Sequence, residues 1–239
     1  MSGATAVAER LAGLRARVAE AARRAGRSPG EVTIVGVAKR QPAARIVEAV
    51  AAGLDCVAES FAQEAREKIP ALREELARRG LPMPRVHFVG RLQTNKARLV
   101  APLCDCVESL DRAELSVELA RRAEALGRRL AVTVQVNLSG EPQKGGVEPD
   151  ALTALLGVCD ALPALELVGL MTVPEAAADS ATLRRRFARL RELRDTAARA
   201  GRPGLRELSM GMSADFELAI EEGATWVRIG TALFGAREG

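Results

Sequence analysis

The sequence is poor in aromatic side chains and in two of the residue types that commonly move protons. Its 239 residues include no tyrosine, one histidine, one tryptophan and five phenylalanines. Aromatic residues make up 3% of the chain, too few for the stacking platforms on which single-stranded nucleic acids bind. The missing tyrosine also removes a group that often serves in acid–base catalysis.

Long apolar segments are missing as well. No uninterrupted run of about 18 apolar residues occurs, so we expect no transmembrane helix and no membrane contact. The first segment carries Glu9, Arg10, Arg15 and Arg17 and contains no apolar core of an export signal. We therefore expect a cytoplasmic protein.

The chain carries both acidic and basic side chains, and its net charge is +4. A basic chain invites a nucleic-acid interpretation, but many arginines lie between Arg184 and Arg194 around an apolar stripe of Leu183, Phe187 and Leu190. That spacing is typical of an amphipathic helix with a solvated charged face. We therefore expect no nucleic-acid partner.

The four cysteines are Cys56, Cys104, Cys106 and Cys159. Cys104 and Cys106 are two residues apart in a strand-like stretch, which would place both thiols on one face of a sheet. The spacing is not Cys-x-x-Cys, and His87 is the only histidine of the sequence. We therefore expect buried, reduced thiols and no metal site.

Short apolar runs of strand character alternate with helical segments along the chain. The strand runs are residues 32–38, 55–58, 85–89, 105–109, 130–136, 165–170, 207–209 and 225–229. The helical segments between them are residues 43–52, 62–79, 96–101, 113–126, 150–162, 180–200 and 214–222. Strict alternation predicts parallel pairing, and eight units favour a closed (β/α)8 TIM barrel over an open Rossmann-like sheet.

The eight units use the whole chain, so we expect residues 1–239 to form a single domain. A further helical segment, with Val7, Leu11 and Leu14 at helical spacing, precedes the first strand. The last unit is cut short near the C-terminus. We therefore expect the N-terminal helix to cover the gap left by a missing final helix.

Lys39 follows the first strand, at the end of the barrel where functional residues gather. Partial desolvation at such a position lowers the pKa of an ammonium group and frees the amine to attack an aldehyde. A surface or helix-capping lysine is the alternative interpretation.

The loops after the seventh and eighth strands combine features of an anion site. Ser213 is a candidate N-cap of the next helix, where free amides face an anion. Gly230 permits close backbone approach, and Thr231 adds a hydroxyl group. These two loops form the usual phosphate site of such barrels, although helix capping and tight turns would explain the same residues.

A lysine on one side of the mouth and a phosphate site on the other match the requirements of pyridoxal 5′-phosphate. Arg228, at the end of the eighth strand, would then face the pyridine nitrogen. An arginine cannot accept a proton from the ring, so the ring would stay neutral and be a weaker electron sink. A structural salt bridge is the alternative for Arg228.

Six stretches of the chain carry a family resemblance. They are residues 35–42, 86–96, 137–142 with 144–146, 169–174, 209–216 and 227–235. In this order they resemble the YggS/PROSC family of pyridoxal-phosphate homeostasis proteins, which share the barrel of the alanine racemase N-terminal domain (fold type III of the pyridoxal-phosphate proteins).

The resemblance implies a role for each candidate residue. Lys39 would form the aldimine with the cofactor, and Arg228 would contact the pyridine nitrogen. Ser213, Gly230 and Thr231 would contact the phosphate. Met210, in the same stretch as Ser213, would lie against the cofactor.

The sequence departs from the family pattern in three places. Ala58-Glu59-Ser60-Phe61 stands where the family usually has Gly-Glu-Asn-Tyr. Ser60 is shorter than asparagine, so its contact with the cofactor would be lost or mediated by water. Val86 replaces the customary tryptophan, and Arg40 follows the lysine where a small polar residue is commoner.

Other polar residues remain open to two interpretations. His87 would be a base or a hydrogen-bonded structural histidine. The 140–146 loop, with Lys144 among glycines, would be a flap at the mouth or a long turn. Gln93, Asn95 and Lys96 open a helix at the same face and would contact a partner or a ligand.

The resemblance implies a non-catalytic carrier or buffer of pyridoxal 5′-phosphate, with amino acids as exchange partners and apo-enzymes as recipients. We expect a monomer. The alternative is an amino-acid racemase of the same barrel type. That reaction needs acid–base groups on both faces of the α-carbon, and the related enzyme uses a lysine and a tyrosine. This sequence has no tyrosine and no residues left for that enzyme's second β domain.

Overall fold

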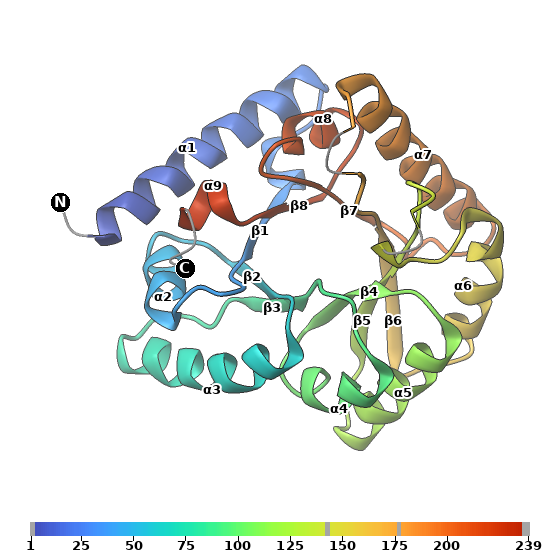
Figure 1. Ribbon diagram of the computed structural model, residues 1–239, viewed down its shortest axis with the longest axis horizontal. Helices are drawn as coiled ribbons and strands as arrows, with labels where there is room; N and C mark the ends of the chain where they lie inside the picture. Colours follow the sequence, from blue (N-terminus) through green and yellow to red (C-terminus); the bar gives the residue numbers. More distant parts are fainter. Residues whose placement is uncertain (1–2, 142–143, 176–177, 236–239) are drawn as a thin grey trace.

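The computed structural model describes residues 3–141, 144–175 and 178–235, and its strands form a closed barrel (Figure 1). The strands are β1 (Thr33–Val37), β2 (Cys56–Glu59), β3 (Arg85–Phe88), β4 (Cys106–Leu110), β5 (Leu130–Gln135), β6 (Leu165–Met171), β7 (Glu207–Met212) and β8 (Trp226–Ile229). Each strand pairs in parallel with the next, and β8 closes the barrel against β1. The predicted TIM barrel is confirmed, and the open sheet is excluded.

The helices surround the strands in Figure 1. They are α1 (Gly3–Arg24), α2 (Ala43–Ala51), α3 (Ala62–Arg78), α4 (Ala97–Val100), α5 (Ala113–Ala125), α6 (Leu152–Asp160), α7 (Ser180–Arg199), α8 (Phe216–Glu221) and α9 (Thr231–Phe234). Short 3-10 turns lie at η1 (Pro29–Glu31), η2 (Thr94–Lys96) and η4 (Pro149–Ala151). Most ends lie within two residues of the predicted ones, but β7 runs three residues further, to Met212.

Two apolar layers stabilise the barrel. The larger layer lies between strands and helices, and a small one, which includes Val35, Ala58 and Trp226, fills the interior. Cys106 belongs to the interior, whereas Cys104 precedes β4 and packs in the outer layer. The prediction that both thiols face one side is therefore wrong, because Cys104 lies outside the strand. All four cysteines are buried and free.

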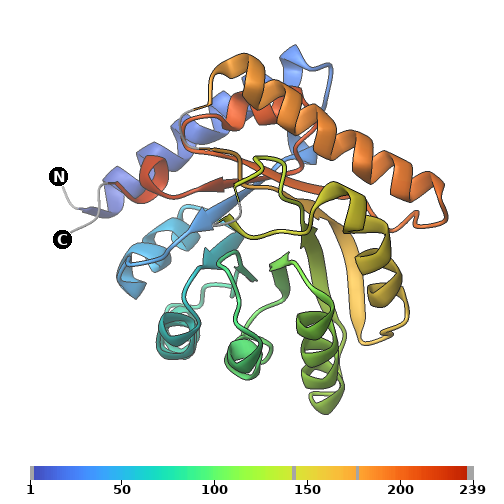
Figure 2. The ribbon, with the colours of Figure 1, turned by 45° about the vertical axis from the view of Figure 1, so that its right-hand side comes forward.

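The helix α1 closes the outer wall beside the last unit. It packs against α2, α8 and α9, and Figures 1 and 2 show it lying alongside the single turn of α9. This confirms that the N-terminal helix covers the side where the final helix is short. None of the described helices is both long enough and apolar enough to cross a membrane.

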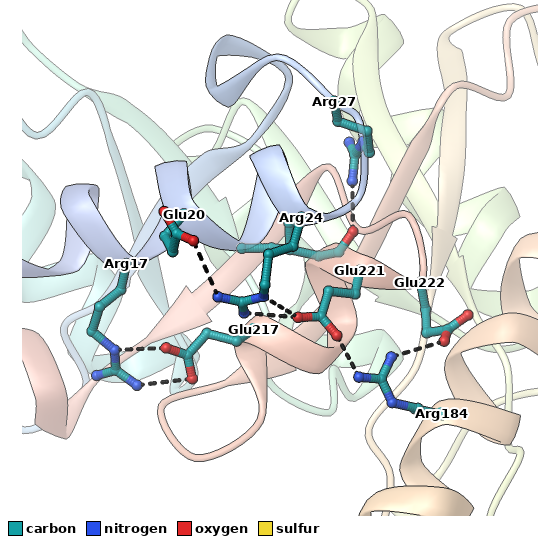
Figure 3. A network of polar contacts seen from close by, with 9 residues as sticks. Arg17, Glu20, Arg24, Arg27, Arg184, Glu217, Glu221 and Glu222 are labelled. Carbon is teal, nitrogen blue, oxygen red and sulfur yellow. Dashed lines mark hydrogen bonds and ion pairs between the residues drawn. The ribbon is translucent and has the colours of Figure 1, made fainter.

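Ion pairs join α1, α7 and α8 across this wall (Figure 3). Arg17 contacts Glu217 at 2.8 Å, and Arg24 contacts Glu221 at 2.7 Å. Arg184 of α7 pairs with the same Glu221. The prediction of a solvated charged face on the 184–194 helix is therefore incomplete, because Arg184 also forms an ion pair that joins α7 to α8.

Candidate functional site

A cavity of about 580 Å³ opens at the carboxyl ends of the strands. It is lined by Val37, Lys39, Ser60, Phe61, Val89, Gly90, Arg91, Val173, Met212, Ser213, Ala214, Arg228, Gly230 and Thr231. Six of the seven residues predicted to bind a cofactor are among them. Parallel strands all end at the same rim, so residues that are far apart in sequence meet there.

Lys39 lies two residues beyond the end of β1, in a turn that leads to α2. Its side chain is half-buried and lines the cavity. The turn also places Arg40 in the left-handed region, with a φ of 58°.

Ser213 and Thr231 bring the last two loops together. The two hydroxyl oxygens lie 3.5 Å apart, and the amide of Ala232 donates a 3.4 Å hydrogen bond to Ser213 Oγ. Ser213 is not a helix N-cap, because β7 runs to Met212 and α8 begins only at Phe216. The serine instead lies in the turn between them, which still directs it to the cavity.

Met210 does not reach the cavity. It is fully buried in the outer apolar layer, and Met212 lines the cavity in its place. The pairing with β8 shifts register between Ser209 and Met212. Gly211 lies at this irregularity with a φ of +90°, and a Cβ there would be 2.5 Å from Ala219 of α8. Leu208 and Met210 both face the outer layer, as alternation around the interior Ser209 requires, and the bulge at Gly211 turns Met212 towards the cavity.

Ser60 lies where the ends of β2 and β3 approach each other. A Cβ on Gly90 would be 2.0 Å from the carbonyl oxygen of Ser60, so only glycine permits this contact. The neighbouring Phe61 is 46% exposed, and the Arg40 guanidinium lies 5.7 Å from the centre of its ring.

Arg228 enters the cavity from inside the barrel, where it is 5% exposed. It donates to Ser209 Oγ at 2.5 Å and to the Thr172 carbonyl at 2.7 Å. Ser209 in turn donates to Glu108, and Glu108 contacts Nδ1 of His87 at 2.6 Å. We call Arg228, Ser209, Glu108 and His87 the interior network.

The interior network keeps opposite charges together where their side chains are almost entirely buried. Burial raises the pKa of Glu108, but His87, Arg228 and Ser209 together hold it below its ordinary value. Burial lowers the pKa of His87, but Cys56 and Glu108 raise it by more, to about 10. Burial also lowers the pKa of Arg228, against the effects of Glu108 and Asp215. A guanidinium remains protonated in proteins, so the cavity receives a permanent cation.

His87 lies within the barrel, with its ring 4.7 Å from that of Trp226, and does not line the cavity. The structural interpretation of this histidine is therefore the better one. Sequence reasoning assigned no role to Glu108 or Ser209. The available signal was polarity, because Glu108 interrupts a strand whose other residues are small or apolar.

The remaining candidates lie around the mouth. Lys144 donates to the Pro174 carbonyl at 2.8 Å and pairs with Glu141, so this part of the 140–146 loop is anchored. Residues 142–143 of that loop lie outside the described residues. Gln93 and Lys96 border a separate cavity of about 260 Å³, which Asn95 does not line.

Comparison with known proteins adds a family context to this geometry. Residues 10–238 match the family model of the alanine racemase N-terminal domain. A pyridoxal phosphate homeostasis protein of Pseudomonas aeruginosa is 47% identical over 232 residues, which are 97% of this chain and 96% of that protein.

Solved structures resemble the barrel closely. PipY of Synechococcus elongatus, solved with pyridoxal phosphate bound, is 37% identical with a TM-score of 0.83, over 96% of this chain and all of that one. The alanine racemase of Corynebacterium glutamicum is 18% identical with a TM-score of 0.68, over 98% of this chain and 62% of that chain. The latter similarity concerns the fold alone.

Proposed function

We propose, since this chain belongs to the family of pyridoxal phosphate homeostasis proteins with the alanine racemase N-terminal fold, that it binds pyridoxal 5′-phosphate covalently at Lys39. It would carry or buffer the cofactor inside the cell without catalytic turnover. The observation that carries the proposal is one cavity lined by Lys39, Arg228, Ser213 and Thr231.

The donor set of the cavity fits the charges of this cofactor. None of the described residues that line it is an aspartate or a glutamate, whereas Lys39, Arg91 and Arg228 are cationic. The hydroxyls of Ser213 and Thr231 converge on one side and suit a phosphate group. Gly230 adds backbone at the same place without a side chain in the way.

The cofactor supplies an aldehyde as the electrophile. The Lys39 amine would form a C=N bond with the aldehyde carbon, and the oxygen would leave as water. Arg228 would donate a hydrogen bond towards the ring nitrogen. Because Glu108 and Ser209 hold that guanidinium charged and in place, the nitrogen would remain unprotonated and the ring a weak electron sink.

The same geometry favours a carrier over the alternative, an amino-acid racemase. A racemase needs a second acid–base group at the cavity, and the sequence contains no tyrosine. His87 is bonded to Glu108 inside the barrel and does not line the cavity. Amino acids would exchange with Lys39 at the Schiff base, apo-enzymes would receive the cofactor, and the protein would act as a monomer.

The proposal is tested by reduction and peptide mapping. Borohydride should fix the cofactor on Lys39, and Lys39→Ala should give a folded protein without the visible absorption band. Lys144→Ala, which changes a lysine that does not line the cavity, is the matched control and should keep the band. A full band in Lys39→Ala would contradict the assignment.

The absence of turnover needs its own assay. Alanine, serine, glutamate and lysine are incubated with the protein in deuterated water, and α-proton exchange and chirality are followed. We expect no sustained racemisation. Racemisation that is lost in Lys39→Ala would establish the racemase instead.

A further inference from the structure

The turn that carries Lys39 rests on a largely buried ion cluster, none of whose residues lines the cavity. The cluster consists of Glu59 at the end of β2 and of Glu64 and Lys68 on α3. Nζ of Lys68 lies 2.8 Å from Glu59 Oε1 and 2.6 Å from Glu64 Oε1. We call these three residues the α3 cluster.

The α3 cluster contacts the backbone on both sides of Lys39. Lys68 donates a hydrogen bond of 2.8 Å to the carbonyl oxygen of Ala38. Glu64 Oε1 accepts a hydrogen bond of 2.6 Å from the amide of Arg40. The residues before and after the lysine are therefore held by one pair of opposite charges, four residues apart on a single helix.

The conformation held in this way is an unfavourable one. Arg40 is the only non-glycine residue with a positive φ among the described residues. A side chain in the left-handed region costs free energy and persists where surrounding contacts hold it. The contact of Glu64 with the amide of Arg40 is such a contact, and it acts on the residue that directly follows Lys39.

Two of the three side chains of the α3 cluster are almost fully buried, and the third, Glu64, is 23% exposed. The Lys68 side chain is 10% exposed and that of Glu59 is 1% exposed. Burial raises the pKa of Glu59 to about 7, although Lys68 lowers it, and Glu59 Oε2 has no hydrogen-bond partner among the described residues. Buried charges of this kind are expensive unless they are paired, so the cluster has little freedom to rearrange.

We infer that Lys68 and Glu64 are positioning residues, which hold residues 38–40 in the strained turn and so direct the Lys39 amine to the bound aldehyde. The inference rests on the proposed covalent binding at Lys39. Without the cluster the turn relaxes at Arg40, and the amine moves away from the place where the phosphate site and Arg228 present the aldehyde.

The central variant is Lys68→Met, which keeps a long side chain and removes the ammonium group. The hydrogen bond that is lost lies within the protein, so its full strength, roughly tenfold to 150-fold in an equilibrium constant, is an upper limit for the change in affinity. We expect a weaker binding of pyridoxal 5′-phosphate within that limit and a slower formation of the visible band. Glu64→Gln should give a smaller change in the same direction.

A second substitution separates positioning from mere stability. Glycine tolerates a positive φ, so Arg40→Gly removes the strain that the α3 cluster has to hold. Arg40→Gly in the Lys68→Met protein should therefore restore much of the affinity and of the rate. Arg17→Gln, which breaks a pair between α1 and α8, is the matched control and should leave both unchanged.

Amide hydrogen exchange at Arg40, in protein stripped of cofactor, reports on the turn without any cofactor chemistry. We expect faster exchange in Lys68→Met and in Glu64→Gln than in the parent protein. Unchanged exchange, affinity and rate in both variants would overturn the inference, even if both unfold more easily in urea.

The two proposals fail in different ways. If borohydride labels Lys39 in the parent but Lys68→Met binds with the parent's affinity and rate, the positioning role is wrong and covalent binding stands. If Lys39 is not labelled in the parent, covalent binding is wrong. The exchange at Arg40 still decides whether the α3 cluster holds the turn.

Discussion

Two polar networks in this protein use the same chemical groups in opposite surroundings. The interior network joins Arg228, Ser209, Glu108 and His87 from four strands, and none of these side chains is more than 5% exposed. The second network, which we call the exterior clasp, joins Arg17, Arg24 and Arg184 to Glu217, Glu221 and Glu222 (Figure 3). Its arginine side chains are 41–49% exposed.

The difference between the two networks separates charges that stabilise the fold from charges that shape the cavity. Exposed ion pairs contribute about 0–1 kcal/mol each, so the exterior clasp fastens α1 through several small contributions. A buried pair is often no more stable than apolar residues of similar volume, yet removing one partner is costly. Stability alone therefore does not explain the interior network. What the interior network provides is a charged Arg228 side chain that is held in place at the cavity.

The largest expected effect comes from breaking the interior network. Glu108→Leu should lower the free energy of unfolding by about 3–5 kcal/mol, because it leaves Arg228 and His87 buried without their carboxylate. Urea denaturation measures this, with Glu108→Gln as a milder control that keeps volume and an acceptor oxygen. A loss below about 1 kcal/mol would show that the remaining groups compensate, and that the two networks do not differ in kind.

The next largest effect is expected at the cavity. Replacing an uncharged residue there should cost more free energy than breaking an exposed ion pair of the exterior clasp. Thr231→Ala should weaken binding of pyridoxal 5′-phosphate by roughly tenfold to 150-fold and binding of pyridoxal far less, because the hydroxyl would contact the phosphate. Affinities of both ligands are measured by absorbance. Thr182→Ala on α7 is the matched control, and equal losses for both ligands would place the phosphate elsewhere.

Glu59 resembles Glu108 in being buried, but one of its carboxylate oxygens has no hydrogen-bond partner among the described residues. Burial raises its pKa from 4.5 to about 7, so its contribution to stability is fully present below pH 4.5 and is lost as the pH rises through 7. Glu59→Gln does not ionise. Between about pH 5.5 and 8, the parent protein should therefore lose roughly 2 kcal/mol of stability relative to Glu59→Gln.

Urea denaturation of both proteins at each pH measures that difference, and groups common to both cancel. A relative stability that does not change with pH would mean that Glu59 keeps its ordinary pKa. A change of the opposite sign would mean that Lys68 dominates and lowers the pKa of the carboxyl group.

The smallest effect is expected at the exterior clasp. Glu221→Gln should cost about 0.2–1 kcal/mol for each of the pairs it makes with Arg24 and Arg184. The cost should shrink in about 1 M salt, where charges are screened within a few ångströms. The loss caused by Glu108→Leu should persist in the same salt. Equal salt dependence of the two variants would remove the distinction between the networks.

Much of the site was predictable because barrel geometry places functional residues by rule. Lys39, Arg228, Gly230 and Thr231 each follow or end a strand, and parallel strands share one rim. The part played by Met212 was not predictable, because the bulge at Gly211 turns this side chain towards the cavity, whereas Met210 keeps the outward face that alternation gives it. Strand alternation is readable in a sequence, whereas a break in register depends on what packs against the strand.

The sequence by itself determined the architecture of this protein. Apolar strand runs alternating with amphipathic helices allow few arrangements other than parallel strands covered on both faces, and eight of them close. Only the tertiary structure determined which partners the charged residues behind the cavity have. Glu108 meets Ser209 across 101 positions, and Lys68 reaches the carbonyl of Ala38 across 30. Such contacts carry no local signal, because a buried charge finds its partner through folding and not through spacing along the chain.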